Sequence, residues 1–409
     1  MESGGEWKGS ASIRTVNRRS RESTQVNLRL RQLRVNMFVD ALPRVPLLAP
    51  LVAALLAGSA ASAQQSSPPT QPASATINLD VVVRPNSGPP VSDLQQQDFT
   101  LLDNKDPQSI TSFRAVDGRQ ADVDVILVVD AVNAGYETVA YERDQIDKFL
   151  RADQGELLHA TSLVVLTDAG IQTLEDFLKD GNKLSASLDR YAVSLRFVNR
   201  SAGFYGATER FQMSLQGLHE AIQREANRPG RKFMIWISPG WPFLSGPEVE
   251  MSSKVQQQLY ADVIAFSTDL LRSRITLYSI DPFGTQANIL RASYWQDFLK
   301  AISKPRQVLP GNLALQVLAT QSGGVALYGN NDIAELLQTC LADTRAYYEV
   351  SFDPPAGSAS NEYHRLEIRV AKHGLTARTR QGYCTRPSLG WEPVLPTSIQ
   401  EVAPGLTSR

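Results

Sequence analysis

The feature that most constrains the fold is the stretch DVDVILVVDAVNAG, residues 122–135, in which an apolar run ends in an aspartate. Such a run of aliphatic residues is typical of a strand covered on both faces, so it predicts a parallel sheet flanked by helices. Asp130 would then lie at the carboxyl end of its strand, the edge where open α/β sheets bind ligands. Asp130 is therefore a candidate site residue. The alternative is an aspartate that caps the next helix or accepts hydrogen bonds from loop amides.

Strand and helix patterns alternate along residues 122–343. Apolar runs such as TSLVVLT, KFMIWIS and ITLYSID are separated by amphipathic stretches such as ATERFQMSLQGLHEAIQREA. This alternation predicts an α/β fold with a doubly wound, mostly parallel sheet. We therefore assign residues 122–343 to one α/β domain.

The segments on either side of this domain, residues 76–116 and 346–384, carry short strand patterns and turn-rich sequences. Neither segment holds enough strands to be stable alone. The simplest way to bury their apolar faces is to pair them with each other. The sequence thus predicts one small β module built from both ends of the chain.

The N-terminal region has the pattern of a secretory signal. A basic leader, with seven arginines between residues 14 and 34, precedes the apolar stretch VPLLAPLVAALLAG, and Ala61 and Ala63 fit the small residues required for cleavage after Ala63. The apolar stretch falls short of the roughly 20 residues of a membrane span. We expect residues 1–63 to be removed, with Met1 or Met37 as the start. The mature chain, secreted or periplasmic and without a transmembrane helix, would begin with a linker at 64–75 and end in a tail at 385–409.

Net charge bears on the class of partner, and the cysteine content bears on whether the chain forms a disulfide. The chain has 41 basic and 42 acidic residues and a formal net charge of -1, so nothing in its overall charge favours nucleic acid. Its two cysteines, Cys340 and Cys384, are compatible with a disulfide in an oxidising compartment. Two separate buried thiols fit the sequence equally well.

The order of several short segments resembles that of a known family. VSDLQQQDFTLLDN, VVDAVN, GRKFMIWISPG, YSIDPFG, AYYEVSFDPP and TRQGY follow one another as in the von Willebrand factor A-related proteins found in acidobacteria. The resemblance covers about residues 76 to 385. It implies a secreted or envelope protein with a Rossmann-like A domain, a fold used chiefly for adhesion and protein assembly.

The resemblance also implies a metal-ion-dependent adhesion site, which in this sequence is degenerate. Asp130 matches the first aspartate of the family motif D-x-S-x-S, and Thr208 is a match for its threonine, while Asn133 offers a carbonyl oxygen. The two serine positions hold Val132 and Ala134, and the last aspartate is replaced by Pro239 in IWISPG. Because a hard cation such as Mg²⁺ needs about six oxygen ligands, we expect metal binding here to be weak or absent.

The leading functional hypothesis is a non-enzymatic module that binds a protein partner through the loops at the carboxyl edge of the sheet. Trp241 and Phe243, in the Pro/Gly-rich loop PGWPFLSGP, are candidate anchors, or else fold back over the sheet edge. The alternatives are an envelope scaffold without a metal site and a hydrolase that uses Asp130 and Asp281. For Asp281 a loop-capping role is favoured, and the sequence has no GxSxG elbow or phosphate-binding glycine loop.

Overall fold

The computed structural model describes residues 76–118, 121–192, 203–242, 244, 251–284, 293–300, 302–355 and 362–385. The predicted signal, the linker and Phe243 lie outside these ranges, as does the tail beyond Thr385. None of the helices within these ranges has the length and apolar character needed to cross a bilayer.

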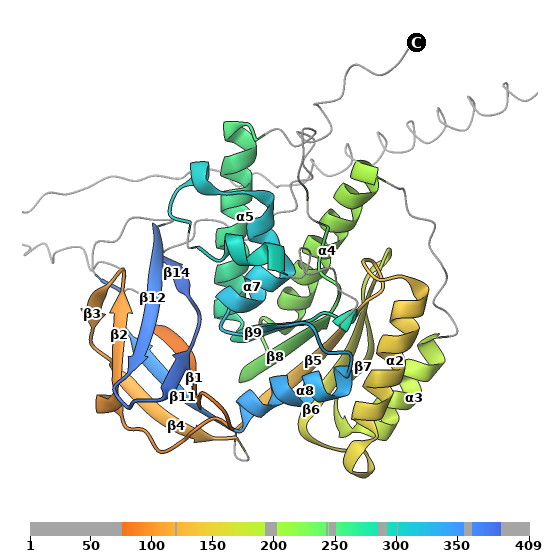
Figure 1. The fold of residues 1–409 in the computed structure, drawn as a ribbon, viewed down its shortest axis with the longest axis horizontal. Coiled ribbons are helices and arrows are strands. Elements are labelled where there is room, and N and C mark those ends of the chain that lie inside the picture. Colours follow the sequence, from red (N-terminus) through yellow and green to blue (C-terminus); the bar gives the residue numbers. More distant parts are fainter. Residues whose placement is uncertain are drawn as a thin grey trace, which may run out of the picture. The chain divides into compact units, whose positions relative to one another are not determined.

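A six-stranded sheet forms the centre of the α/β domain (Figure 1). Its strands lie in the order β10-β9-β8-β5-β6-β7, and all neighbours are parallel except β6 and β7. The strands are β5 (Val123–Asp130), β6 (Glu156–Thr167), β7 (Gly170–Asp180), β8 (Arg231–Ile237), β9 (Ile275–Ile280) and β10 (Ala326–Leu327). The predicted fold class, a doubly wound and mostly parallel sheet, is confirmed.

Helices cover both faces of this sheet, because successive residues of its central strands alternate between two apolar clusters. One face packs against α2 (Tyr136–Leu150), α3 (Gly181–Ala192) and α8 (Ile333–Leu341). The other packs against α4 (Gly203–Glu225), α5 (Ser253–Arg272) and α7 (Leu315–Gln321). Short 3-10 helices are η2 (Gln96–Asp98), η3 (Ala152–Gly155), η5 (Tyr294–Phe298), η6 (Pro305–Gln307), η7 (Pro310–Leu313) and η8 (Ala342–Thr344).

The remaining strands form the predicted β module, in which N-terminal and C-terminal segments pair. One four-stranded sheet has the order β13-β1-β11-β4 and the other β14-β12-β2-β3, with antiparallel neighbours throughout. The N-terminal strands are β1 (Ile77–Pro85), β2 (Phe99–Asp103), β3 (Asp106–Gln108) and β4 (Ser112–Asp117). The C-terminal strands are β11 (Ala346–Phe352), β12 (Glu362–Val370), β13 (Leu375–Arg378) and β14 (Gly382–Thr385). Apolar side chains from both sheets share one core.

A buried carboxylate links the β module to the α/β domain. Asp343 of η8, whose side chain is 1% exposed, accepts hydrogen bonds from Arg84 of β1 and from Arg378 of β13. The Tyr278 hydroxyl on β9 donates to the same carboxylate at 2.8 Å. Asp343 therefore joins the central sheet to two strands of the module.

The disulfide considered between Cys340 and Cys384 does not form. Both are free thiols and both are buried. Cys340 packs in the apolar cluster between α8 and the six-stranded sheet, whereas Cys384 lies on β14 of the β module. Burial raises the pKa of both thiols, that of Cys384 to about 12.

Candidate functional site

Asp130 is the last residue of β5, at the carboxyl edge of the six-stranded sheet, and is fully buried. The chain turns directly after it. Its Oδ1 accepts hydrogen bonds from the backbone N–H groups of Val132 and Asn133, each at 2.9 Å. This side of the carboxylate is thus engaged by its own loop.

The other carboxylate oxygen is held by three side-chain donors. Oδ2 accepts from Asn133 Nδ2 at 2.8 Å and from Ser238 Oγ at 2.8 Å. The indole Nε1 of Trp236 donates to it at 3.3 Å. Since a carboxylate offers about four lone-pair sites, protein donors satisfy this group without any cation.

The residues around Asp130 do not fit a hard cation. Asn133 turns its amide nitrogen, and not the expected carbonyl oxygen, toward Asp130, and that nitrogen also donates to Ser214 Oγ at 2.8 Å. Val132 and Ala134 are buried and apolar. Among the described residues, no group of three or more His, Cys, Asp or Glu side chains is arranged to hold a metal ion.

Thr208, the third expected ligand, does not meet Asp130. The residue of α4 that contacts the Asp130 loop is Ser214, six positions later, which places Thr208 about 9 Å further along the helix axis. The Thr208 hydroxyl donates instead to the Phe204 carbonyl within the helix. The predicted set of Asp130, Asn133 and Thr208 is therefore assembled only as the pair Asp130–Asn133.

A second buried acid lies near this edge. Glu142 on α2 is 0% exposed, and neither of its carboxylate oxygens has a hydrogen-bond partner. Burial raises the pKa of Glu142 well above its usual value, and the neighbouring carboxylates Asp130 and Asp281 raise it further. Burial and nearby like charges both disfavour the ionised form, so the folded protein favours the neutral form of Glu142.

Asp281 directly follows β9 at the same edge, as expected from the sequence. Its Oδ1 accepts a hydrogen bond from the backbone N–H of Phe283 at 2.9 Å, so it caps its own loop. Asp281 is 8% exposed. Asp130, Asp281 and Glu142 thus form an acidic group beneath the edge that is closed to bulk solvent.

Trp241 is not the exposed anchor that the loop composition suggested. It is 2% exposed and packs edge-on against Trp236, with ring centroids 5.9 Å apart. Trp241 therefore covers the sheet edge beside Asp130, which was the alternative interpretation of this loop. Phe243 lies outside the described residues.

Two tyrosines that the sequence interpretation overlooked are exposed at this edge. Tyr136 begins α2 and is 63% exposed, and Tyr205 lies in the first turn of α4 and is 62% exposed. Because Ser214 meets the Asp130 loop, Tyr205 stands about 13 Å beyond that contact along α4. Both tyrosines are large amphipathic side chains at the ligand-binding edge of the fold.

The other overlooked residues had weak but readable signals. Glu142 lies on the apolar stripe of its helix with Val139 and Ile146, where a charged residue is unusual. Ser238 directly follows the fully buried strand β8, and Asp130 is the last residue of the neighbouring strand β5. Two neighbouring parallel strands that both end at a polar residue bring those two side chains together.

Comparisons with known proteins concern the fold alone. No family model matches the chain, and no curated protein matches it. Among solved structures, human COPII-coat protein Sec24c is similar at 9% identity and a TM-score of 0.30, over 65% of this chain and 44% of that one. Manganese-loaded Plasmodium vivax TRAP protein is similar at 11% identity and a TM-score of 0.30, over 66% of this chain and 96% of that one. The SpRpn10 VWA domain is similar at 12% identity and a TM-score of 0.22, over 39% of this chain and 75% of that one.

Proposed function

We propose that this chain is an exported, non-enzymatic protein-binding or adhesion module that engages its partner at the carboxyl edge of the six-stranded sheet without a bridging cation. The observation that carries this proposal is the state of Asp130, whose two carboxylate oxygens accept five hydrogen bonds from the protein. A carboxylate engaged in this way has no free lone pairs for a metal that a partner's acidic side chain could share.

The surface offered to a partner is aromatic. Tyr136 and Tyr205 are exposed at the starts of two helices that rise from this edge, one on each face of the sheet. Tyrosine supplies large contact area at a low cost in side-chain entropy and is enriched among the residues that dominate binding energy. These two side chains take the role first considered for Trp241 and Phe243.

An enzymatic role for the acidic group is the weaker alternative. Acid catalysis needs a carboxyl within hydrogen-bond reach of a substrate. Asp130 and Glu142 are both 0% exposed, and Asp281 accepts a hydrogen bond from its own loop. An envelope scaffold remains the second alternative, and it differs from the proposal in making no use of the tyrosine surface.

Export is proposed from the leader alone. The basic segment, the apolar stretch VPLLAPLVAALLAG and the Ala61-x-Ala63 pattern together fit a cleaved secretory signal. On this proposal the partner is a protein of the envelope or of the extracellular space.

Site-specific photo-crosslinking tests the proposed surface. A photoreactive phenylalanine analogue placed at Tyr136 or Tyr205 in the full chain should yield a covalent adduct with an envelope protein. Because no cation bridges the contact, the adduct should persist in excess EDTA. The measurement is a mass shift on denaturing gels followed by identification of the crosslinked peptide.

Lys179 provides the matched control, because it is exposed and lies near the end of β7, which runs antiparallel to β6 and therefore ends at the amino edge of the sheet. The same analogue at Lys179 should give no such adduct. Failure to crosslink at both tyrosines would overturn the proposed surface, and loss of the adducts in EDTA would overturn cation-independent binding.

A further inference from the structure

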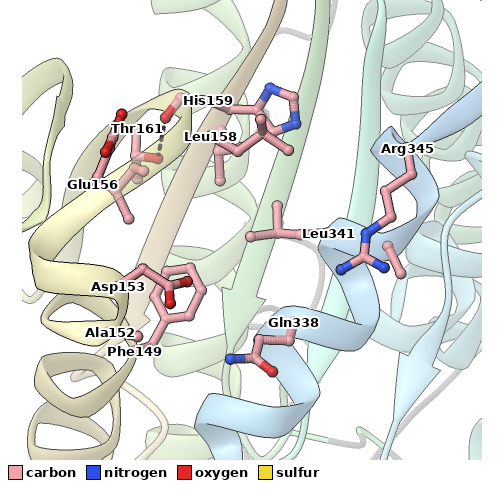
Figure 2. Close-up of a pocket in the computed structure, with 13 residues that line it drawn as sticks. Phe149, Ala152, Asp153, Glu156, Leu158, His159, Thr161, Gln338, Leu341 and Arg345 are labelled. Atoms are coloured by element: carbon pink, nitrogen blue, oxygen red, sulfur yellow. Dashed lines mark hydrogen bonds between the residues drawn. The ribbon is translucent and has the colours of Figure 1, made fainter. Parts of the chain in front are cut away.

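A separate pocket of about 280 Å³ lies at the amino edge of the six-stranded sheet (Figure 2). It is lined by the end of α2, by η3, by the start of β6 and by α8 and η8. Asp130 lies at the other end of β5. The pocket is therefore distinct from the proposed binding edge, and its volume lies just below the usual range for drug-sized ligands.

The floor of the pocket is apolar and its two walls carry opposite charge. Phe149, Leu157 and Leu341 supply apolar surface. Asp153 lies on one side, while Gln338 and Arg345 lie on the other (Figure 2). Within the described part of the chain, neither the Asp153 carboxylate nor the Arg345 guanidinium has an ion-pair partner.

His159 lines the same pocket without adding charge. Its Nε2 lies 2.7 Å from the Thr344 hydroxyl oxygen, and burial lowers the pKa of the imidazole to about 4. His159 is therefore neutral near pH 7, so the charged groups that a ligand would meet are carboxylates from η3 and β6 and the guanidinium of Arg345.

The backbone that carries Asp153 is held in an unusual conformation. Asp153 and Gln154 have φ values of 50° and 63°, in the left-handed region that non-glycine residues seldom adopt. The side chain of Asn182 donates a hydrogen bond to the Gln154 carbonyl at 2.8 Å and so helps to fix this turn. Such strain persists only where surrounding contacts hold it, and here it sets the position of one pocket wall.

We propose that this pocket binds a short zwitterionic peptide of the dipeptide class. The peptide ammonium would pair with Asp153, its carboxylate would pair with Arg345 and Gln338, and an apolar side chain would cover the floor. Because the two charged groups lie on opposite walls, a dipeptide matches them better than a free amino acid does, since its charges are further apart. Arg345 can hold a carboxylate in a bidentate manner.

Calorimetric titration of the full-length protein with L-leucyl-L-leucine tests this assignment. We expect saturable binding of one equivalent, weakened about twofold to fivefold by either Arg345→Gln or Asp153→Asn, because each removes one ion pair at an exposed side chain. Asparagine also tolerates the left-handed backbone at position 153, so this variant should keep the loop intact. Both variants should unfold at the wild-type temperature.

Singly charged analogues of the dipeptide distinguish the contribution of Arg345 to binding from that of Asp153. The dipeptide amide lacks the carboxylate, and it should bind wild type weakly but bind Arg345→Gln no worse than wild type. The N-acetyl dipeptide lacks the ammonium and should show the same pattern with Asp153→Asn. The proposal is overturned if the dipeptide does not bind at millimolar concentration, or if both variants bind it as wild type does. Neither result bears on partner binding at the tyrosine edge.

Discussion

Replacing Asp343 by alanine should lower the free energy of unfolding by about 3 to 5 kcal/mol, the usual cost of removing one partner from a buried ion pair. The Asp343 side chain is 1% exposed and accepts hydrogen bonds from Arg84, Arg378 and Tyr278. Without it, the Tyr278 hydroxyl and the inner faces of two guanidinium groups lose their acceptor. Urea unfolding at pH 7 measures the change.

An exposed ion pair supplies the control for this prediction. Asp144 pairs with Arg143 at 3.2 Å, and its side chain is 67% exposed. Asp144→Ala should therefore cost less than about 1 kcal/mol. If Asp343→Ala cost no more than this control, the buried carboxylate would not be joining the β module to the α/β domain.

Replacing Glu142 by glutamine should stabilise the protein, and the gain should grow with pH. Burial and the neighbouring Asp130 and Asp281 raise the pKa of Glu142 in the folded state. Between the unfolded and folded pKa values, the folded state binds one more proton at this residue than the unfolded state does. The contribution of Glu142 to the free energy of unfolding is therefore fully present below the pKa of the unfolded state. As pH rises above that pKa, the free energy of unfolding falls by about 1.4 kcal/mol per pH unit because of this one group.

Glu142→Gln removes this titration while it keeps the size of the side chain. Variant and wild type should be similar in stability near pH 4.5 and should diverge toward pH 8. Glu137→Gln, on an exposed position of the same helix, should show a difference that is nearly independent of pH. Parallel pH curves for Glu142→Gln and wild type would mean that Glu142 ionises freely in the folded protein.

The main features of the fold were predictable because they follow from strong periodic signals. A fully apolar run such as residues 125–129 needs two covering layers, and short strands at both ends of the chain need each other. β7 was not predicted. It lies at the edge of the sheet, its side chains are only partly buried, and charged residues such as Glu175 and Lys179 obscure the alternation expected of a strand.

A site residue could be placed from the sequence only where its position at the end of a buried strand determines its location. A polar residue that ends a buried parallel strand must lie at the carboxyl edge, which placed Asp130 and Asp281 correctly. The position of Thr208 depended on how far α4 extends past that edge, and the burial of Trp241 depended on its packing against Trp236. Both depend on tertiary contacts that local sequence does not encode.

Calorimetric titration with Mg²⁺, Mn²⁺ and Ca²⁺ tests most directly whether protein donors take the place of a cation at Asp130. With five hydrogen bonds already on its carboxylate, we predict no heat of binding at cation concentrations up to about 1 mM, in wild type and in Asp130→Asn alike. Micromolar binding in wild type that disappears in Asp130→Asn, with the variant still folded, would contradict this account and would show a working metal site.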